Sequence, residues 1–263
     1  MSFLRPLGNT GLQVSALGLG TVKFGRNSGV KYPAAFELPD DNTIRNLLAV
    51  ARESGINVLD TAPAYGSSEE RIGQLLQHRQ DWVLVTKVGE EFDGTHSKFD
   101  FSAAHTRISI ERSLQRLRTD YLDLVLVHSD GDDEAILRQG DCIQMLRDFH
   151  KRGAIRAIGM SVKTDAGGVL AAELLDAVMV TYNLQQQDHA AVERAHVLGK
   201  GVLVKKGLMS GHVNADATGG MQDLVRDSMN AVLGNNCIHS MIVGTLSTSH
   251  LRRNVELALA ALA

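Results

Sequence analysis

The chain has 263 residues, of which 44% are hydrophobic and 22% are charged, and its formal net charge is −3. A chain of this size can bury about 73% of its unfolded surface in one core, so it needs neither disulfides nor metals for stability. Its basic residues are scattered along the sequence and form no basic tract, which argues against nucleic acid as a partner.

The sequence shows no feature of export or membrane insertion. The N-terminus, MSFLRPLGNTGL, has no apolar signal segment, and no apolar run approaches the ~18 residues of a membrane span. Cys142 and Cys237 lie far apart without metal-ligand spacing, so each is interpreted as an isolated thiol. These features predict a soluble, cytoplasmic protein.

Runs rich in Val, Ile and Leu recur along the chain and alternate with segments of helical period. This alternation is typical of βαβ units and a parallel sheet. In chain order the eight predicted strands are residues 15–21, 56–62, 82–88, 122–128, 155–161, 177–183, 201–206 and 240–245. Residues 3–14, which precede them, contain two short extended runs around the turn Gly8–Gly11 and predict a β-hairpin.

The helical segments complete the predicted architecture. Apolar residues at helical spacing occupy residues 110–117, after Ser102 as N-cap, and again residues 251–262. No linker divides the chain, so residues 1–263 are predicted to form a single domain. Eight β/α units in one domain favour an α/β fold of the (β/α)₈ TIM barrel type over a doubly wound sheet, with the hairpin plugging one barrel end.

The longest stretch without regular structure is predicted at residues 22–40. Loops of this length in compact domains are often binding loops. Phe24, Lys31 and Tyr32 are therefore candidate pocket walls, and a tolerated surface insertion is the alternative.

Ionisable residues stand at four of the predicted strand ends. Catalytic groups of a barrel lie at the carboxyl ends of its strands. Singly, each such residue could be a turn cap, a solvated strand end or a satisfied polar group. Together they indicate a functional site. The polar residues at those ends are Asp60, Lys87, His128, Ser161, Lys205 and Lys206.

Tyr65 follows Asp60 in the loop DTAPAYGSSEE, where a simply packed aromatic is the alternative interpretation. A tyrosine becomes a usable acid when a lysine lies beside it, because the positive charge favours the phenolate. Lys87 is the predicted cation, and Asp60 would hold it by a salt bridge. His128 would donate a hydrogen bond that orients a carbonyl oxygen. This arrangement would protonate an oxygen as it gains negative charge.

Five segments, in this order, resemble signatures of the aldo-keto reductase superfamily: NVLDTAPAYGSSEERIG, VLVTKVG, YLDLVLVHS, AIRAIGMS and IVGTLSTSHLRRNVE. The resemblance covers nearly the whole chain. It implies an NADPH-dependent reductase of aldehydes or ketones on a TIM barrel. In that reductase Tyr65 would be the general acid, Lys87 and Asp60 its activators, and His128 the orienting residue.

The cofactor site is expected away from any Rossmann motif, because Lys23 stands where the third glycine of that motif belongs. Barrels bind phosphate at the loops after strands seven and eight, here 205–211 and 244–250, although helix capping by Ser247 and Thr248 is the alternative. The resemblance implies dinucleotide contacts at Gly20, Thr21, Asp60, Ser161, Lys205, Lys206, Leu208, Ser210, Thr245, Leu246, Ser247, His250, Arg253 and Asn254.

The chain departs from the family pattern around the nicotinamide. Val162 and Met179 replace the Asn and Gln that hold the carboxamide in many members. Lys205 replaces a stacking aromatic, and His250 replaces the basic residue that commonly meets the 2′-phosphate. NADPH/NADP⁺ is therefore expected with a modest preference over NADH. The loops after the fourth and seventh strands are short for the family, which predicts an open pocket.

An acidic cluster, residues 130–134, follows His128. Carboxylates at this position complement the N-terminal dipole of the next helix, and we prefer this interpretation to a metal site. No metal is predicted.

Two other functions stay open at this stage. A Schiff-base aldolase would use a strand-end lysine, namely Lys87, Lys205 or Lys206. A non-enzymatic nicotinamide-binding regulator would act on a partner protein. In the leading hypothesis the partner is a small carbonyl substrate, and its identity depends on the variable loops 22–40, 89–101, 129–133 and 208–218.

Overall fold

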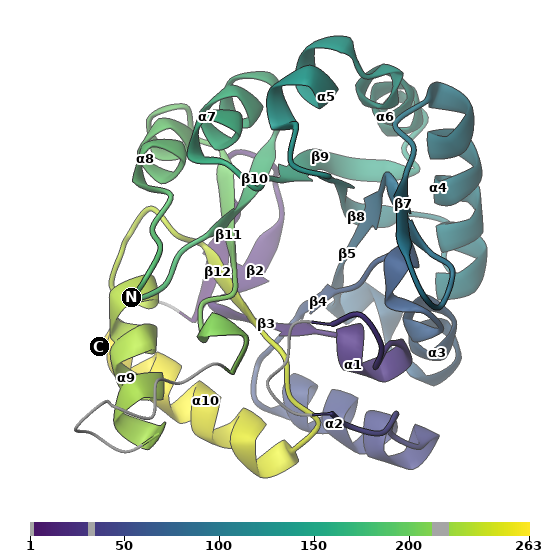
Figure 1. Cartoon of the computed structure of the whole chain (residues 1–263). Coiled ribbons are helices and arrows are strands. Elements are labelled where there is room, and N and C mark those ends of the chain that lie inside the picture. Colours follow the sequence, from purple (N-terminus) through teal and green to yellow (C-terminus); the bar gives the residue numbers. More distant parts are fainter. Residues whose placement is uncertain (1–2, 31–34, 212–220) are drawn as a thin grey trace.

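A closed barrel of eight parallel strands forms the centre of the molecule, with helices around it (Figure 1). The computed structural model describes residues 3–30, 35–211 and 221–263. Each barrel strand pairs with the next one in sequence, and the last pairs with the first. The predicted TIM barrel is confirmed. Its strands are β3 (Leu17–Gly20), β4 (Val58–Asp60), β5 (Val83–Val88), β8 (Leu122–His128), β9 (Ile155–Ser161), β10 (Ala177–Thr181), β11 (Gly201–Lys205) and β12 (Ser240–Val243).

The predicted N-terminal hairpin, β1 (Leu4–Pro6) and β2 (Gln13–Ser15), is also confirmed. Its apolar residues Leu7, Leu12 and Val14 are fully buried and belong to one cluster with side chains inside the barrel. Arg5 donates a hydrogen bond to the Ile238 carbonyl, just before β12 begins. The hairpin therefore plugs the amino end of the barrel and leaves the carboxyl end for a site.

Helices pack around the barrel and bury apolar faces against the strands. The predicted N-cap Ser102 is confirmed, because it accepts a hydrogen bond from the His105 amide at 3.2 Å. Ser247, for which capping was the alternative to phosphate binding, also caps its helix by accepting from the His250 amide at 3.2 Å. The helices are α1 (Val22–Gly25), α2 (Asp41–Glu53), α3 (Ser68–Leu75), α4 (Ala103–Leu117), α5 (Asp133–Gln139), α6 (Asp141–Lys151), α7 (Asp165–Leu174), α8 (His189–Val197), α9 (Met221–Leu233) and α10 (Thr248–Leu262).

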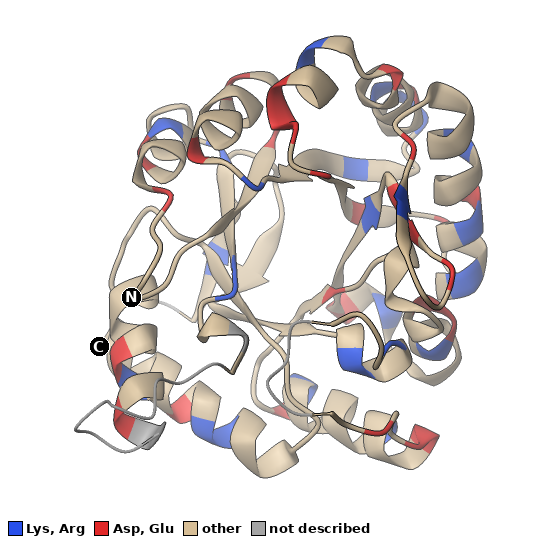
Figure 2. Cartoon of the chain, in the orientation of Figure 1, with Lys and Arg blue, Asp and Glu red and all other residues tan. Residues whose placement is uncertain are grey.

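The core has two parts, one inside the barrel and one between the barrel and its helices. Each fully buried Leu, Ile or Val contributes about 1.5–3 kcal/mol of transfer free energy to folding. Acidic and basic residues are interspersed over the outer helices (Figure 2). Among the helices of the described residues, none has both the length and the apolar character that a bilayer span requires.

The segment 22–40 is only partly as expected. Residues 22–25 form the short helix α1, and Phe24 is fully buried in the core. The prediction that Phe24 lines the pocket is therefore wrong, because one turn of helix directs this ring toward the hydrophobic interior. The two other candidate walls, Lys31 and Tyr32, lie outside the described residues.

Candidate active site

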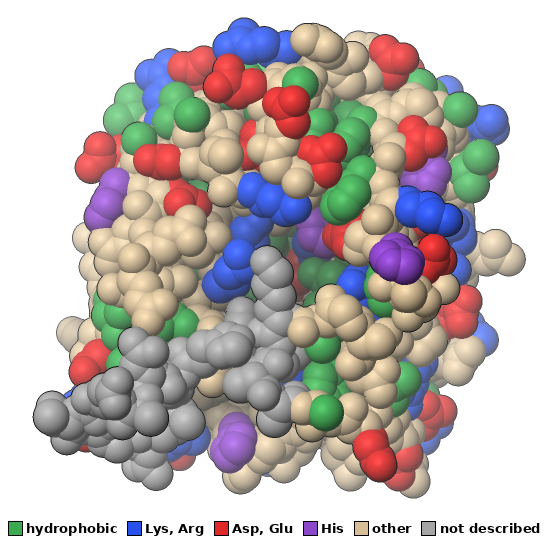
Figure 3. Space-filling model, viewed as in Figure 1, with side chains coloured by type: hydrophobic (Ala, Val, Ile, Leu, Met, Phe, Trp, Pro, Cys, Tyr) green, Lys and Arg blue, Asp and Glu red, His purple; other side chains and the backbone are tan. Residues whose placement is uncertain are grey.

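A cavity of about 700 Å³ opens at the carboxyl ends of the barrel strands. Its size falls within the usual range of small-molecule sites. In the space-filling view, basic side chains and a histidine surround this hollow (Figure 3). Five of the six predicted polar strand-end residues line its walls, namely Asp60, His128, Ser161, Lys205 and Lys206, and Lys87 does not. Gly20, an expected cofactor contact, also lines the cavity.

Asp60 on the cavity wall forms a buried ion pair with Lys87, which lies behind it. The Lys87 Nζ donates to Asp60 Oδ1 at 2.7 Å and to the Thr61 carbonyl at 2.8 Å. Tyr65 belongs to a single 3₁₀ turn, Pro63–Tyr65, which follows β4. This turn places the tyrosine ring with its centroid 4.8 Å from Lys87 Nζ. The structure thus brings together the lysine, the carboxylate and the tyrosine that the sequence indicated.

The electrostatics of Tyr65 differ from the sequence-based expectation. Burial raises the pKa of Tyr65 to about 12, although the neighbouring Lys87 acts in the opposite direction. Burial alone would lower the pKa of Lys87, but Asp60, followed by Tyr65, stabilises the ammonium so that the pKa is raised overall. Lys87 therefore stays cationic, and Tyr65 keeps its proton at neutral pH.

His128 ends β8 and faces Tyr65 edge-on, with 6.3 Å between ring centroids. Its Nδ1 lies 2.8 Å from Glu90 Oε2. Glu90 lies here because Gly89, with φ +103°, turns the chain from β5 into a second hairpin, β6 (Glu90–Phe92) and β7 (Ser97–Phe99). Burial lowers the pKa of His128, and the Glu90 carboxylate opposes that shift.

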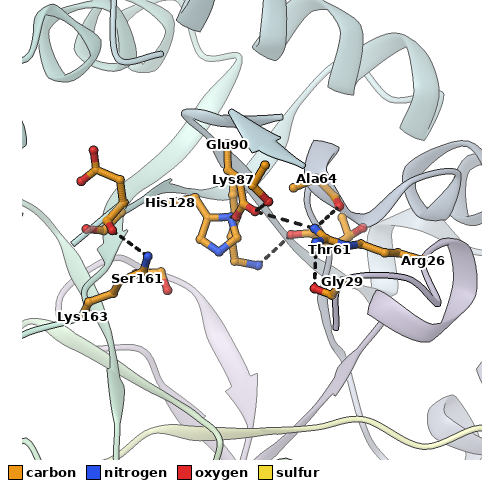
Figure 4. A network of polar contacts seen from close by, with 12 residues as sticks. Arg26, Gly29, Thr61, Ala64, Lys87, Glu90, His128, Ser161 and Lys163 are labelled. Carbon is orange, nitrogen blue, oxygen red and sulfur yellow. Dashed lines mark hydrogen bonds and ion pairs between the residues drawn. The ribbon is translucent and has the colours of Figure 1, made fainter. Parts of the chain in front are cut away.

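Glu90 is held in its ionised form by several groups. Burial opposes ionisation, but His128, Ser97 and Arg26 together lower the pKa of Glu90 to about 2. Ser97 Oγ donates to Glu90 Oε1 at 2.5 Å, and an Arg26 nitrogen lies 3.7 Å from the same oxygen. Figure 4 shows Arg26 also bound to the carbonyls of Ala64 and Gly29, so this guanidinium links the β6–β7 hairpin to the loops after β3 and β4.

Sequence reasoning missed Glu90, Arg26 and Phe99, although all three line the cavity. The available signal was indirect. Residues 89–101 were predicted as a pocket loop, and Glu90 is the first carboxylate after the third barrel strand. Nothing in the sequence indicated that this loop forms a hairpin, which brings Glu90 to His128.

Two glycines leave space in the cavity wall near β3 and β12. A Cβ atom on Gly20 would lie 3.1 Å from Ile242 Cγ2 and 3.7 Å from the Val243 carbonyl oxygen, so this glycine keeps that wall open. Gly244, which also lines the cavity, leads into the N-terminus of α10. Backbone amides of a first helical turn suit a phosphate group. These features fit the nicotinamide cofactor that the family resemblance implies.

Several predicted cofactor residues do not line the cavity. Thr21 is buried, and its Oγ1 donates to the Asp60 carbonyl at 2.9 Å, so it supports the wall from behind. Leu208 packs against the core, and the side chain of Ser210 lies outside the described part of the chain. The remaining members that do not line the cavity belong to the loop after β12 or to α10: Thr245, Leu246, Ser247, His250, Arg253 and Asn254.

Val162 and Met179, the two departures from the family pattern, are buried apolar residues. Met179 belongs to the cluster inside the barrel, and Val162 to the core outside it. Lys205 bonds Ser161 Oγ at 2.8 Å and the Val162 carbonyl at 2.5 Å. The Lys205 amine on the cavity wall is therefore held at the backbone of Val162.

The acidic cluster has structural contacts. Asp133 accepts hydrogen bonds from the amides of Lys163 and Thr164 and from Thr164 Oγ1, and Asp132 caps α5 through the Ala135 amide. These carboxylates join the start of α5 to the loop after β9. Among the described residues, no group of three or more potential ligands is arranged for a metal ion.

The comparisons with known proteins place this chain and its fold in one family. A model of the aldo/keto reductase family matches residues 16–223, and the chain belongs to this family. A Pseudomonas aeruginosa protein assigned to the aldo-keto reductases has a crystal structure that matches with a TM-score of 0.89 and 49% identity, over 99% of this chain and 95% of that one.

Two curated relatives are more distant. L-galactose dehydrogenase of Arabidopsis thaliana is 36% identical over 60% of this chain and 48% of its own length. The NADH-specific methylglyoxal reductase of Escherichia coli is 32% identical over 59% of this chain and 50% of its own length. The matches thus span about half the length of these curated relatives.

Proposed function

We propose that this protein is an NADPH-dependent oxidoreductase that reduces an aldehyde or a ketone to an alcohol. The observation that carries the proposal is the position of Tyr65 beside the Lys87–Asp60 ion pair, at a cavity on the carboxyl end of the barrel. Family membership and the names of the two curated relatives, a dehydrogenase and a reductase, support the same reaction class.

Tyr65 is the general acid in this proposal. With a pKa of about 12 the phenol is protonated at neutral pH. An alkoxide is a much stronger base than a phenolate, so a carbonyl oxygen that gains negative charge can take the tyrosine proton. Lys87 stabilises the phenolate left behind, and Asp60 holds Lys87 in place.

His128 orients the carbonyl oxygen only when it carries a hydrogen on Nε2. Because an ionised Glu90 oxygen lies 2.8 Å from Nδ1, it favours a proton on that nitrogen in the neutral ring, which leaves Nε2 as an acceptor. The protonated ring can donate from both nitrogens. The orienting form of His128 is therefore the imidazolium, which the Glu90 carboxylate favours.

A nicotinamide cofactor, when bound, supplies the hydride. We assign its binding to the wall formed by Gly20, Asp60, Ser161, Lys205 and Lys206 and to the start of α10. Thr245, Ser247, His250 and Arg253 are the residues proposed to meet the 2′-phosphate that distinguishes NADPH from NADH. The preference for NADPH is expected to be modest for two reasons. His250 replaces the basic residue that commonly meets the 2′-phosphate, and Arg253 already pairs with Glu256 at 2.9 Å.

A binding titration with NADPH, NADP⁺, NADH and NAD⁺, followed by a panel of aldehydes, ketones and dicarbonyls, tests this function. We expect the tightest binding for the NADPH pair and oxidation of NADPH with at least one class of carbonyl. Tight binding without turnover on any class would favour the non-enzymatic regulator instead. Absence of nicotinamide binding would overturn the proposal.

A further inference from the structure

Lys205 lines the cavity, and its environment differs from that of Lys87, which is buried and does not line it. Lys205 ends β11 on the cavity wall, and its Nζ donates to Ser161 Oγ at 2.8 Å and to the Val162 carbonyl at 2.5 Å. Both partners are neutral acceptors. Among the residues that the structure describes, no carboxylate lies within ion-pair distance of this amine, whereas Asp60 pairs with Lys87 at 2.7 Å.

The surrounding groups favour a neutral amine. Burial is the main influence, followed by the charge of Lys206, and together with Lys87 they lower the pKa of Lys205 to about 7. Asp133 and Asp188 act in the opposite direction from a greater distance. About half of such an amine is neutral at pH 7, against less than about 0.1% of an ordinary lysine.

The hydrogen bonds also orient this amine. A neutral amine has two N–H bonds and one lone pair, and Ser161 Oγ and the Val162 carbonyl accept both N–H bonds. The lone pair then takes the remaining direction around Nζ. A neutral lysine amine held at a cavity wall without a carboxylate partner can attack an electrophilic carbon.

We propose that Lys205 captures carbonyl compounds: its Nζ forms an imine with small unhindered aldehydes that enter the cavity. The nitrogen lone pair attacks the carbonyl carbon and a C–N bond forms. The two amine protons pass in net terms to the oxygen, the C–O bond breaks as water leaves, and a C=N double bond forms. No oxidant or reductant is consumed. This activity does not depend on the proposed carbonyl reduction, and it gives the cavity a second, covalent way of holding an aldehyde.

The other lysines provide an internal comparison. Lys87 is 1% exposed and is held as an ammonium by Asp60, so it has no lone pair to offer. The side chains of Lys98 and Lys151 are 75% and 73% exposed, each near an aspartate. If accessibility alone controlled the reaction, Lys98 and Lys151 would react first. If the cavity environment controls it, Lys205 reacts first.

The test is reductive trapping at pH 7. The wild-type protein, without cofactor, is treated with a limiting amount of propanal and cyanoborohydride, which reduces an imine to a stable secondary amine. Peptide mass spectrometry then measures the modified fraction of each lysine. We expect at least tenfold more modification at Lys205 than at Lys98 or Lys151. Modification that follows exposure, or an unmodified Lys205, would overturn the proposal.

The pH dependence of trapping gives a second measurement. Modification of Lys205 should reach half its maximal rate near pH 7, and the Lys206→Met variant should move this midpoint upward because a neighbouring positive charge is removed. Lys200→Met is the matched control, since Lys200 precedes β11 at the opposite end of the barrel, and should leave the midpoint unchanged. Equal midpoints in the wild type and Lys206→Met would contradict the electrostatic basis of the proposal.

Protection by cofactor separates this inference from the proposed function. Saturating NADP⁺ should slow modification of Lys205 and leave Lys98 and Lys151 unaffected, because Lys205 is also assigned to the cofactor wall. Trapping at Lys205 that NADP⁺ does not slow supports the imine and contradicts that cofactor assignment. Cofactor binding with no trapping at Lys205 contradicts the imine and leaves the reductase proposal standing.

Discussion

Glu90 Oε2 and His128 Nδ1 lie 2.8 Å apart. Glu90 comes after the barrel strand β5, whereas His128 is the last residue of β8. The carboxylate is the principal group that raises the pKa of His128 against the effect of burial. It also fixes which ring nitrogen carries the proton in the neutral form. Glu90 is thus a positioning residue that acts through His128.

We predict that Glu90→Gln lowers the pKa of His128 and the pH range in which carbonyl reduction is fastest. The imidazolium is the form that can donate to a carbonyl oxygen, so kcat/KM should rise as the pH falls through the pKa of His128, which lies below 6.5. Removing the negative charge of Glu90 should move this rise in kcat/KM to lower pH. The kcat/KM profile and the imidazole resonances of His128 in NMR titrations measure the shift.

Glu91→Gln is the matched control for this prediction. Glu91 is the adjacent residue, but it contacts Arg112 and His105 rather than His128. The Glu91→Gln variant should keep the wild-type pH profile of kcat/KM. Glu90→Asp keeps a carboxylate, so it should lower the pKa of His128 less than Glu90→Gln does. An unchanged His128 titration in Glu90→Gln would show that the contact has no electrostatic effect.

The residues that sequence reasoning located share one property. Lys87 and His128 are polar residues near the ends of apolar strands, and a barrel requires such strand ends to meet at one cavity. Glu90 lacks this signal because it follows a glycine turn, and its approach to His128 depends on how residues 90–99 pair. Phe24 was misassigned because its burial depends on a single helical turn, α1, that apolar periodicity cannot predict over four residues.

Tyr65→Phe should reduce kcat by about 10²–10⁴-fold, the usual contribution of a general acid. The ring and its packing are kept, so cofactor affinity should change little. Tyr121→Phe is a suitable control, because Tyr121 precedes β8 at the amino end of the barrel and its ring lies against Arg79. A Tyr65→Phe enzyme that keeps more than about a third of the wild-type kcat would exclude Tyr65 as the acid.

Binding of NADPH should be tighter than binding of NADH at low salt, and the difference should shrink as salt rises. The extra phosphate is expected to meet Arg253, His250 and the amides at the start of α10, and such contacts are screened by salt. Arg253→Met should reduce the ratio of the two affinities. Arg252→Met, which removes the neighbouring arginine paired with Glu53, should not. Equal affinities at low salt would remove the 2′-phosphate site.

His239 should make folding stability depend on pH between about 6.5 and 4. Burial lowers the pKa of His239 to about 4, and its Nδ1 accepts a hydrogen bond from the Val202 amide at 3.0 Å. The unfolded chain binds the proton first as the pH falls, so the stabilisation is complete above about pH 6.5 and is lost progressively down to about pH 4. The loss should be on the order of 3 kcal/mol, since each unit of pKa difference corresponds to about 1.4 kcal/mol.

Urea unfolding at several pH values measures this dependence. His239→Asn keeps an acceptor for the Val202 amide but cannot be protonated, so its stability should vary less over the same range. His96→Asn changes an exposed histidine near the tip of the β6–β7 hairpin and should behave like the wild type. Parallel curves for the wild type and His239→Asn would rule out this histidine as the cause.

Lys87→Met should cost nearly as much reductase activity as Tyr65→Phe, and the double variant should lose little more than either single one. Lys87 has one proposed role, which is to stabilise the Tyr65 phenolate against burial. Residues that act as one unit give strongly non-additive losses. Removing the lysine also leaves Asp60 buried without its ion-pair partner, so a lower melting temperature is expected.

Values of kcat/KM per folded molecule, with a melting curve for each protein, distinguish three roles of Lys87. Losses in the two single variants that simply multiply in the double variant would contradict the coupled acid. A structural lysine would give a lower melting temperature with near-normal turnover. A Schiff-base nucleophile would give complete loss whether or not Tyr65 is present, together with borohydride trapping at Lys87. The 2.7 Å ion pair with Asp60 predicts that trapping at Lys87 does not occur, because an ammonium held by a buried carboxylate is not nucleophilic.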